Sequence, residues 1–367
     1  MLETNALNLK WMKRAISLAS LGKGLTSPNP LVGAVILDKK GRLISEGFHH
    51  KSGMPHAEAM ALNNLKKDPE GGTLFVNLEP CCHSGKTPPC VNQIISSKIK
   101  EVFISIEDPD KRVSGKGIKL LKEAGIKINL GLCAEESRDI NKSFIHKNLT
   151  GKSYGVLKWA MSIDGRIGLK NGKSKWITNV FSRSFVHKLR AEVDAIIVGG
   201  NTLRKDDPIL TTRGLKYPEP LRVIFTKSLD LPKKCNFWDS EQANSLVIYD
   251  SSSANERYLS RIPSWVEVKK VSSNNPEEIS KLLAKKGCNK VLWECGPKLA
   301  TSALKAGCIQ ELITFIAPKI LGGIDAMTPL SDLKIKGIEE AITLDKKQIN
   351  FFDDDILLRT IFKQKQK

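Results

Sequence analysis

Apolar positions in the first 150 residues alternate between helical spacing and short unbroken runs. Apolar residues that recur every three or four positions predict helices, whereas short apolar runs between turn signals predict buried strands. The predicted helices cover residues 7–21, 56–65, 91–99 and 117–124, and the predicted strands cover 31–37, 73–78, 101–106 and 126–130. Strands that alternate with helices indicate an α/β fold in which helices cover both faces of a sheet.

A polar stretch at residues 147–153 separates this series from a second one. Beyond it, helices are predicted at 182–192 and 297–306, and strands at 154–160, 195–198, 221–225, 245–249, 291–293, 312–317 and 356–361. A chain of 367 residues is long enough for two domains of ordinary size. We therefore expect two α/β domains, one at residues 1–150 and one at residues 151–367.

Composition narrows the class of protein. Hydrophobic residues make up 41% and charged residues 26%, values that allow two full-sized cores and exclude wholesale disorder. No run approaches the roughly 20 apolar residues of a membrane span, and the N-terminus lacks the apolar block and cleavage site of a secretory signal. Eight cysteines are too few for a disulfide framework. These features predict a cytoplasmic protein without a membrane partner, whose cysteines pack, bind metal or react.

The formal charge of +19 favours an anionic partner. Binding of nucleic acid would need basic residues gathered in a stripe, with aromatic residues between them. The lysines are instead scattered along the whole chain, and aromatic residues make up only 6%. The charge is thus weak support for phosphorylated small molecules, and we expect no nucleic acid partner.

The strongest chemical signal is a histidine and two cysteines of metal-ligand type. His56 lies two residues before Glu58, and prolines precede both Cys81 and Cys90. One imidazole and two thiolates give Zn²⁺ three protein ligands and leave a fourth position for water, which is the pattern of a catalytic site. Zinc makes that water a hydroxide near neutral pH, and a carboxylate that is not a ligand, here Glu58, can carry its proton to a leaving amine. A structural zinc site is the alternative, with Cys82 as a competing ligand.

Local structure is expected to bring these groups together. Two positions apart in mid-helix, His56 and Glu58 would not share a face, so we expect both in the first turn of the helix at 56–65. Cys90 opens the helix predicted at 91–99, where free N–H groups and the helix dipole should lower the pKa of its thiol.

The spacing of the two cysteines departs from the general signature of zinc deaminases, H-x-E followed by P-C-x-x-C. Here the segment 80–90 reads P-C-C-H-S-G-K-T-P-P-C. It matches every fixed place of the pattern P-C-x-H-x-G-x-T-P-P-C, and the segments 28–33 and 47–49 match as well. On these motifs the first domain resembles the deaminase half of the bifunctional riboflavin-biosynthesis deaminase/reductase family.

The resemblance implies a cytidine-deaminase-like three-layer domain that binds zinc. The zinc ligands and the catalytic residue that it implies are His56, Cys81, Cys90 and Glu58. Cys82 falls at a variable place of the family pattern, which favours a packing role. Asn29, between two prolines, is a candidate for binding the pyrimidine edge through its amide, unless it only forms a turn. His83 and Lys86 are further candidates for substrate contacts.

The residue pattern of the second domain is less specific for a function than that of the first. It has no G-x-G-x-x-G, and the glycines at 199–200 and 296, which end predicted strands, are typical either of a phosphate site or of plain turns. Its segments 158–166, 174–178 and 199–213 nevertheless resemble the reductase half of the same family, so the likeness covers nearly the whole chain. The implied fold is dihydrofolate-reductase-like. The implied reaction uses NADPH to reduce the ribose of a ribosylaminopyrimidine 5′-phosphate to a ribityl chain.

Residue roles follow from the resemblance at the matching positions. The residues implied to bind NADPH are Ala160, Trp176, Thr202, Asp206 and Gly296. The residues implied to bind the substrate are Ser174, Arg190, Leu210, Arg213 and Glu294, with Lys158 as a further polar contact. The two arginines are expected to face the phosphate as bidentate donors. Cys295 departs from the pattern, which has a small residue, often glycine, at that place.

Together these observations predict a bifunctional enzyme of riboflavin synthesis. The first domain would remove the 2-amino group of 2,5-diamino-6-ribosylamino-4(3H)-pyrimidinone 5′-phosphate by hydrolysis, and the second would then reduce the ribosyl group with NADPH. The resemblance also implies a homo-oligomer, either a dimer or a tetramer. Two alternatives stay open: a cytidine or deoxycytidylate deaminase fused to another reductase, and a basic protein that binds or edits nucleic acid.

Overall fold

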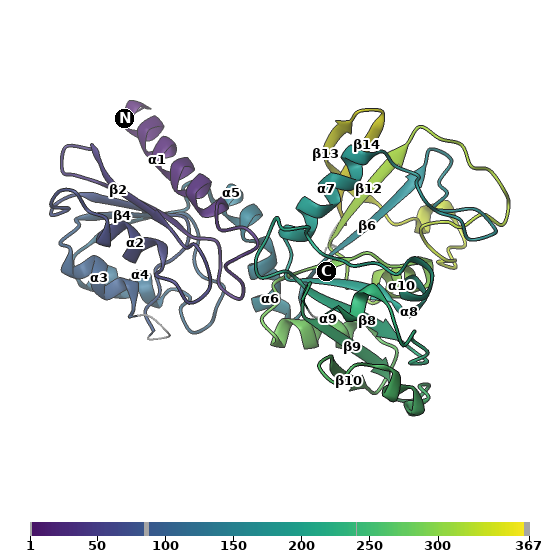
Figure 1. Ribbon diagram of the computed structural model, residues 1–367. Helices are drawn as coiled ribbons and strands as arrows, with labels where there is room; N and C mark the ends of the chain where they lie inside the picture. The colour runs from purple at the N-terminus through teal and green to yellow at the C-terminus, as the bar shows by residue number, and fades with distance from the viewer. Residues whose placement is uncertain (1, 84–87, 240, 363–367) are drawn as a thin grey trace. The chain divides into compact units, whose positions relative to one another are not determined.

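A computed structural model describes residues 2–83, 88–239 and 241–362 of the chain. These residues divide into two compact units, one that ends at Thr150 and one that begins at Gly151 (Figure 1). Helix α6 (Lys142–Thr150) extends to the end of the first unit. The polar stretch at 147–153 is therefore helical over its first four residues. The sequence alone indicates a linker there, because a polar helix end has the composition of a linker.

The first unit is built around a five-stranded sheet with helices on both faces. Its strands are β1 (Gly33–Leu37), β2 (Leu43–Phe48), β3 (Thr73–Val76), β4 (Glu101–Ile104) and β5 (Lys127–Leu130). Its helices are α1 (Leu2–Ser20), α2 (Ala57–Asn63), α3 (Cys90–Ser96), α4 (Lys116–Glu123), α5 (Ala134–Ile140) and α6. The strand order is β2-β1-β3-β4-β5, in which β1 runs antiparallel to both of its neighbours and β3, β4 and β5 are parallel.

Alternate residues of the strands face two different layers of helices. On β1, Ala34 and Ile36 pack into a buried cluster with residues of α2, α3 and α4. Val35 and Leu37 point the other way and pack against Met12 of α1. Since successive side chains of a strand point to opposite faces, the unit has three layers, with α1 on one side of the sheet and α2, α3 and α4 on the other (Figure 1).

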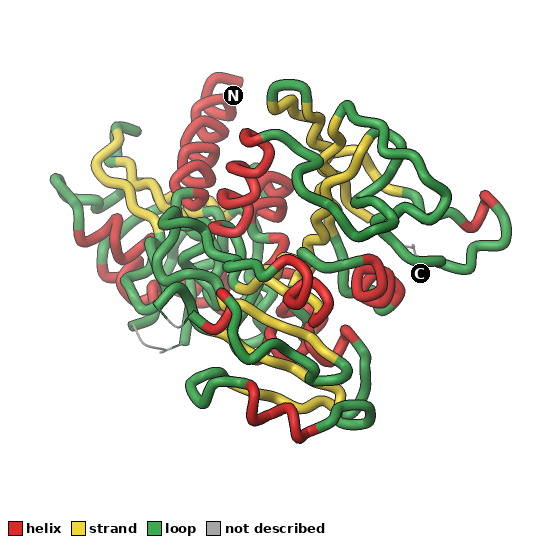
Figure 2. The backbone as a smooth tube through the Cα atoms, turned by 45° about the vertical axis from the view of Figure 1, so that its right-hand side comes forward, coloured by secondary structure: helices red, strands yellow, loops and turns green. Residues whose placement is uncertain are grey.

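The second unit contains a nine-stranded sheet, also covered on both faces. Its strands are β6 (Tyr154–Ser162), β7 (Ala195–Gly199), β8 (Leu221–Thr226), β9 (Ser245–Asp250), β10 (Glu267–Val271), β11 (Lys290–Trp293), β12 (Glu311–Ala317), β13 (Leu344–Phe352) and β14 (Asp355–Phe362). Its helices are α7 (Val180–Ala191), α8 (Gly200–Asp206), α9 (Pro276–Lys285) and α10 (Pro297–Lys305), with 3₁₀ turns at Asn236–Trp238, Glu256–Arg261 and Ile338–Glu340. The strand order is β10-β9-β8-β7-β11-β6-β12-β14-β13. In this spatial order, all the strands from β10 across the sheet to β12 are parallel to one another. Strand β14 runs antiparallel to both β12 and β13. The strands are the yellow segments of the tube in Figure 2.

Two buried clusters flank this sheet. One contains Val186 and Leu189 of α7, and the other contains Leu283 of α9 and Ala300 of α10. Helices therefore cover opposite faces of the mainly parallel strands, as the alternation of predicted elements indicates. Among the described residues, no helix is both long enough and apolar enough to cross a membrane.

Every predicted helix and strand is present, with ends that differ by a few residues, but several elements were not predicted. The missed elements are β2, β10, β13, α5, α6, α8 and α9. Outer strands such as β10 and β13 carry runs of lysine and little apolar alternation, because one edge or face of them meets water. Helix α9 did carry a start signal, since Asn275 caps it and Pro276 follows.

A substitution at Gly33 tests the close contact between α1 and the sheet of the first unit. A Cβ atom at this position would lie 2.1 Å from the carbonyl oxygen of Ala15 and 2.7 Å from the amide nitrogen of Ala19. We expect Gly33→Ala to lower the free energy of unfolding by about 1–3 kcal/mol, because α1 must move away from the strand. Urea unfolding of the full chain measures this change. Lys13→Ala, on the exposed face of α1, should change it by less than about 0.5 kcal/mol, and equal curves for the two variants would contradict the packing.

Candidate functional sites

Three potential metal ligands converge in the first unit. His56 is the N-cap residue of α2, Cys81 follows β3, and Cys90 is the first residue of α3. His56 Nδ1 lies 3.4 Å from Cys81 Sγ and 3.5 Å from Cys90 Sγ. The three donor atoms lie within 4.8 Å of one another, and within the described parts of the chain no other group of histidine, cysteine and acidic side chains converges in this way.

These separations fit a zinc ion. Zn–S bonds of about 2.3 Å and a Zn–N bond of about 2.0–2.1 Å, at tetrahedral angles, place nitrogen and sulfur ligands about 3.5 Å apart. The observed distances match that value without rearrangement. Thiolate and imidazole are also ligands that Zn²⁺ prefers. Three protein ligands leave one tetrahedral position, which is the arrangement of a catalytic site rather than of a closed structural one.

Glu58 lies beside these donors in the first turn of α2, as predicted. Its side chain is 3% exposed and is not one of the converging donors. Burial, together with the negative charge on Cys81, raises the pKa of the Glu58 carboxyl to about 7. A carboxyl group with such a pKa exchanges protons near neutral pH, which suits general acid–base chemistry.

The two thiols differ in acidity. The pKa of Cys81 is lowered to about 4, chiefly because its sulfur accepts a hydrogen bond from the Cys90 thiol and also interacts with His56. Donation to Cys81 and burial raise the pKa of the Cys90 thiol. This direction is opposite to the expectation that the start of α3 lowers the pKa of Cys90.

Two neighbours of the donors were also considered as functional residues. Cys82 stays outside the donor group: it packs against the apolar cluster under α2, α3 and α4, and its thiol donates to the Arg112 carbonyl oxygen at 3.9 Å. His83 Nδ1 is buried and has no hydrogen-bond partner within the described residues, so a ligand can supply one. Lys86 lies outside the described residues.

Asn29 lies in the segment that leads into β1. Its Nδ2 is 3.1 Å from Nε2 of His49. The imidazole of His49 packs edge-on against that of His56, with ring centroids 5.4 Å apart. One side chain thus separates Asn29 from the metal-ligand group. His49 belongs to the segment 47–49 that matches the family pattern, but sequence reasoning assigned it no role.

Glu79 is a second residue that sequence reasoning missed. Its buried carboxylate accepts hydrogen bonds from the N–H groups of Asp108, Gly115 and Ile118, at 3.1, 2.9 and 3.1 Å. It thereby ties the segment that carries Cys81 to the loop after β4 and to α4. Burial also raises the pKa of the Asp108 carboxyl to about 7. The spacing of residues along the chain does not indicate a role for Glu79 or Asp108, because the contacts of both depend on the fold.

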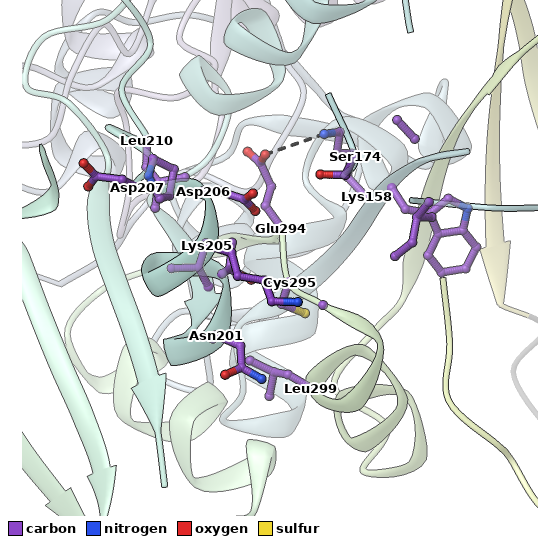
Figure 3. A pocket seen from close by; sticks show the side chains of 18 of the residues that line it. Lys158, Ser174, Asn201, Lys205, Asp206, Asp207, Leu210, Glu294, Cys295 and Leu299 are labelled. Atoms are coloured by element: carbon purple, nitrogen blue, oxygen red, sulfur yellow. Dashed lines mark ion pairs between the residues drawn. The ribbon is translucent and has the colours of Figure 1, made fainter. Parts of the chain in front are cut away.

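The second unit contains a cavity of about 1540 Å³ at the carboxyl ends of its parallel strands. All eleven residues of this unit that are predicted to bind NADPH or the substrate line it. They come from β6 and the loop after it, from α7, from α8 and the loop after it, and from the turn between β11 and α10. Figure 3 shows Lys158, Ser174, Asp206, Leu210 and Glu294 among the side chains that line the cavity. Pockets for one small molecule measure about 300–1,000 Å³. This cavity therefore has room for a cofactor and a substrate together.

A buried cluster of three charges forms part of the cavity wall. Arg190 donates to the Glu294 carboxylate from Nε at 2.7 Å and from Nη2 at 3.1 Å. Lys158 Nζ lies 3.6 Å from the same carboxylate, and this ion pair is the dashed line in Figure 3. Strand register produces this contact, because Trp293 pairs with Leu157 and the next residues therefore lie side by side. Burial would raise the pKa of Glu294, but the charges of Arg190 and Lys158 hold it at about 2. Burial lowers the pKa of Lys158.

One of the two arginines expected to contact the phosphate already has protein partners. The Nε–Nη2 edge of Arg190 is occupied by Glu294, and its Nη1 donates to the Thr211 carbonyl oxygen at 3.1 Å. A bidentate contact from this edge of Arg190 to a phosphate would therefore have to displace Glu294. Arg213 lines the same cavity from the loop after α8.

The loop after α8 has an unusual backbone. Asp207, Leu210 and Arg213 have φ values of 41°, 59° and 55°, in the left-handed region that residues other than glycine seldom adopt. The Asp207 carboxylate anchors the loop, since it accepts the N–H of Asn236 at 2.8 Å. Such backbone strain persists where surrounding contacts force it, and it concentrates at functional sites. Leu210 and Arg213 are two of the predicted substrate residues.

The cavity also suits the phosphates of a dinucleotide. Helices α8 and α10 begin there, after Gly199 and Gly296, and neither helix start has a side-chain cap. Lysine and arginine side chains outnumber acidic ones along the lining. Free N–H groups at a helix start and nearby cations are the usual partners of phosphate. Cys295 also lines the cavity. Its side chain is neutral there, because burial raises the pKa of its thiol to about 12.

Comparisons with known proteins place the chain in a family. Residues 153–358 match the RibD C-terminal domain, and residues 6–106 match the cytidine and deoxycytidylate deaminase zinc-binding region. The riboflavin biosynthesis protein RibD of Synechocystis sp. is 39% identical over 334 residues, which cover 91% of this chain and 90% of that protein. This chain belongs to the RibD family. The RibD protein of Aquifex aeolicus is also 39% identical, over 96% of this chain and 98% of its own length.

Solved RibD structures have the same fold over both units. One form of Acinetobacter baumannii RibD superposes with a TM-score of 0.88 at 32% identity, and covers 98% of this chain and 100% of its own. A Thermotoga maritima structure named diaminohydroxyphosphoribosylaminopyrimidine deaminase/5-amino-6-(5-phosphoribosylamino)uracil reductase has a TM-score of 0.86 at 34% identity, with 98% and 99% coverage.

These RibD likenesses confirm the predicted fold class and a bifunctional riboflavin biosynthesis enzyme with a zinc-binding deaminase half and a reductase half. The match to the zinc-binding region alone would also fit a cytidine deaminase. The likeness over both halves is what decides between the family and that alternative.

Zinc content tests the donor group. We expect Cys90→Ser to weaken zinc binding at least about 100-fold, since even the loss of an outer partner of a ligand weakens binding about 10- to 100-fold. Cys82→Ser is the matched control and should retain full zinc. Metal analysis of the purified variants measures both. Zinc retained by Cys90→Ser, or lost from Cys82→Ser, would show that the ligands have been misassigned.

Proposed function

We propose that this chain catalyses two consecutive reactions on one phosphorylated ribosylaminopyrimidine. The first is hydrolysis of the 2-amino group of 2,5-diamino-6-ribosylamino-4(3H)-pyrimidinone 5′-phosphate, which consumes water and releases ammonia. The second is NADPH-dependent reduction of the ribosyl group to a ribityl chain. The observation that carries the proposal is the presence in one chain of both a zinc-type donor group beside a buried carboxyl and a strand-end cavity with room for two ligands.

In the first unit, His56, Cys81 and Cys90 would hold zinc. When bound, zinc supplies a Lewis acid that allows water to attack near neutral pH. Glu58 is buried beside the donors and is free of the ligand set. It would take a proton from the attacking water and return it to the amino group, which then leaves as ammonia. Asn29 would bind the edge of the pyrimidine.

In the second unit, the cavity would hold NADPH and the substrate side by side. When bound, NADPH supplies the hydride, and the protein supplies orientation and charge. The residues proposed to bind NADPH are Ala160, Trp176, Thr202, Asp206 and Gly296, and those proposed to bind the substrate are Lys158, Ser174, Leu210, Arg213 and Glu294. Arg190 would act on the substrate through Glu294, whose carboxylate it orients. We also propose that the chain forms a homo-oligomer, as the resemblance implies.

The product pattern tests the proposal directly. Purified zinc-loaded protein is incubated with the diaminopyrimidine phosphate, with and without NADPH, and the products are identified by mass spectrometry. We expect the deaminated product alone without NADPH, and the deaminated and reduced product when NADPH is added. Deamination without reduction would reject the role of the second unit. No change in either sample would reject both.

Glu58→Gln tests the proton carrier. Loss of general acid–base catalysis typically lowers a rate about 10²–10⁴-fold, and we expect a loss in that range for deamination. Zinc content should stay at the wild-type level, because Glu58 is not among the converging donors. Reduction of separately supplied deaminated substrate is the internal control and should be unchanged. Deamination close to the wild-type rate would remove Glu58 from this role.

Arg213→Ala tests the phosphate contact. We expect the KM for the deaminated substrate to rise about 10- to 100-fold, because hydrogen bonds to charged groups contribute about 1.5–3 kcal/mol, while the KM for NADPH stays the same. The dephosphorylated substrate is the matched probe, and its KM should barely change. Arg190→Lys, in contrast, should lower kcat because it releases Glu294. An equal rise in KM for both substrates would place Arg213 away from the phosphate.

A further inference from the structure

We propose that Arg222 is a positioning residue for the reductase site, which fixes the backbone at Ile209 and thereby sets the place from which Leu210 and Arg213 hold the substrate. This role rests on the proposed function of the second unit. Arg222 is not among the residues that line the cavity, so it acts on a substrate through the loop after α8.

Arg222 is a charged residue in the interior of a sheet. It lies on β8, which pairs with β7 on one side and β9 on the other, and it is 0% exposed. It shares a face of the strand with Ile224, whose buried cluster also contains Leu210. Inner strands of parallel sheets are normally apolar, and burial of a charge is costly unless hydrogen bonds compensate it. A guanidinium at this place therefore needs partners of its own.

The guanidinium donates to three backbone carbonyl oxygens. Nη1 donates to that of Ile209 at 3.3 Å, and Nη2 donates to those of Asp239 and Ala243, both at 2.6 Å. The ring of Phe237 packs against it, with its centroid 5.0 Å from Cζ. Burial lowers the pKa of Arg222 to about 10, so the group is still charged at neutral pH. Its hydrogen bonds are therefore of the strong, charge-assisted kind.

These bonds join two segments that contribute to the cavity wall. Ile209 belongs to the loop after α8, whereas the other two acceptors belong to the connection between β8 and β9. The same two segments also meet at the cavity itself, where the Asp207 carboxylate accepts from the backbone N–H and from Nδ2 of Asn236, at 2.8 and 2.9 Å. Arg222 thus holds from inside the core a contact that Asp207 holds at the cavity.

Leu210 lies between two carbonyl groups that different elements hold. The carbonyl before it is held by Arg222 of β8. The carbonyl of Thr211, after it, accepts from two side chains of α7, His187 Nδ1 and Arg190 Nη1, both at 3.1 Å. Leu210 itself has a φ of 59°. A backbone of this kind persists only where surrounding contacts determine it, and these are such contacts.

Arg213 follows three residues later on the same stretch of backbone. Thr212, just before it, is also held, since its N–H and its hydroxyl donate to the Glu219 carboxylate at 2.7 and 2.6 Å. Arg213 has a φ of 55°, and its exposed side chain lines the cavity. The place of its guanidinium therefore depends on how residues 209–212 are held. Release of the Ile209 carbonyl would let this backbone relax and would move Arg213 away from the phosphate.

Steady-state kinetics of the full-length protein test the proposal. Arg222→Met keeps an unbranched side chain but removes every donor, and Arg222→Lys keeps a charged donor. Val223→Ala is the matched control, because Val223 is the next residue of β8, is fully buried, and packs into the cluster on the opposite face of the sheet. Reduction is measured with the deaminated substrate, with its dephosphorylated form and with varied NADPH. Thermal unfolding and deaminase activity report whether each variant is folded.

We expect Arg222→Met to raise the KM for the phosphorylated substrate about 10- to 100-fold, because the Arg213 contact with a charged group is lost. The KM for NADPH and for the dephosphorylated substrate should change much less, so the preference for the phosphate should fall. KM does not depend on how much of the enzyme is folded, so a merely less stable variant would not show this change. Arg222→Lys should keep part of the preference, since an ammonium group donates without the planar fork. Val223→Ala should lower thermal stability and keep the wild-type preference.

A double-mutant cycle links Arg222 to Arg213. Arg213→Ala combined with Arg222→Met should raise the KM for the phosphorylated substrate no more than about threefold beyond Arg213→Ala alone, since both changes remove one contact. If Arg222→Met does not accumulate as folded protein, the same cycle is measured with Arg222→Lys.

Three results would overturn the proposal. An unchanged phosphate preference in the folded Arg222 variants would mean that Arg222 supports only the core. Multiplicative effects in the cycle would mean that it acts independently of Arg213. An equal loss of preference in Val223→Ala would mean that any weakening of β8 has this effect. A wild-type protein that shows no reduction, or no preference for the phosphorylated substrate, would instead reject the proposed function, so the two failures are distinguishable.

Discussion

Parallel strands carry the residues that follow them to one edge of the sheet, and both candidate sites depend on this constraint. In the first unit, Cys81 follows β3 and Asp108 follows the neighbouring strand β4. In the second unit, Glu294 follows β11 and lies next to Lys158 of β6, because the two strands pair in one register. A slip of one residue would turn Glu294 to the opposite face and break its ion pairs.

Two buried glutamates show how surroundings set the chemistry of one residue type. Burial and the nearby negative charge of Cys81 raise the pKa of Glu58 to about 7. The side chain of Glu294 is only 10% exposed, but Arg190 and Lys158 lie beside it and hold its pKa at about 2. The first is thereby suited to moving a proton, and the second to remaining an anion that binds and orients. Burial alone does not distinguish the two roles, whereas the sign of the neighbouring charges does.

Much of the fold could be read from apolar patterning, and the gaps have physical causes. Central strands such as β7 and β9 are continuous apolar runs, because both of their faces are covered. Strand β2 contains Ser45, Glu46 and Gly47, and it lies at the edge of its sheet, so its pattern is that of a loop. Helix α5 is short and carries several acidic residues, so it has little apolar periodicity.

The residues of the candidate sites also divide into those that the sequence could predict and those that it could not. The spacing of His56, Cys81 and Cys90 was enough to predict three ligands of one ion, since those residue types have few other reasons to recur in that order. The resemblance of local motifs extended this to residues that line the second cavity. The contacts of Glu79 and His49 and the pairing of Arg190 with Glu294 could not be predicted. Each of them depends on segments far apart in the chain.

The sequence by itself therefore determined which chemical groups this protein has and the order in which they occur. It also determined the alternation of strands and helices, because apolar periodicity is a local property of the chain. Only the tertiary structure decided how each group is used. It decided that the Arg190 edge binds Glu294, that the two thiols lie against His56, and that the His49 ring lies beside the Asn29 amide. Protonation and hydrogen bonding respond to neighbours within a few ångströms, and the folded chain selects those neighbours from distant parts of the sequence.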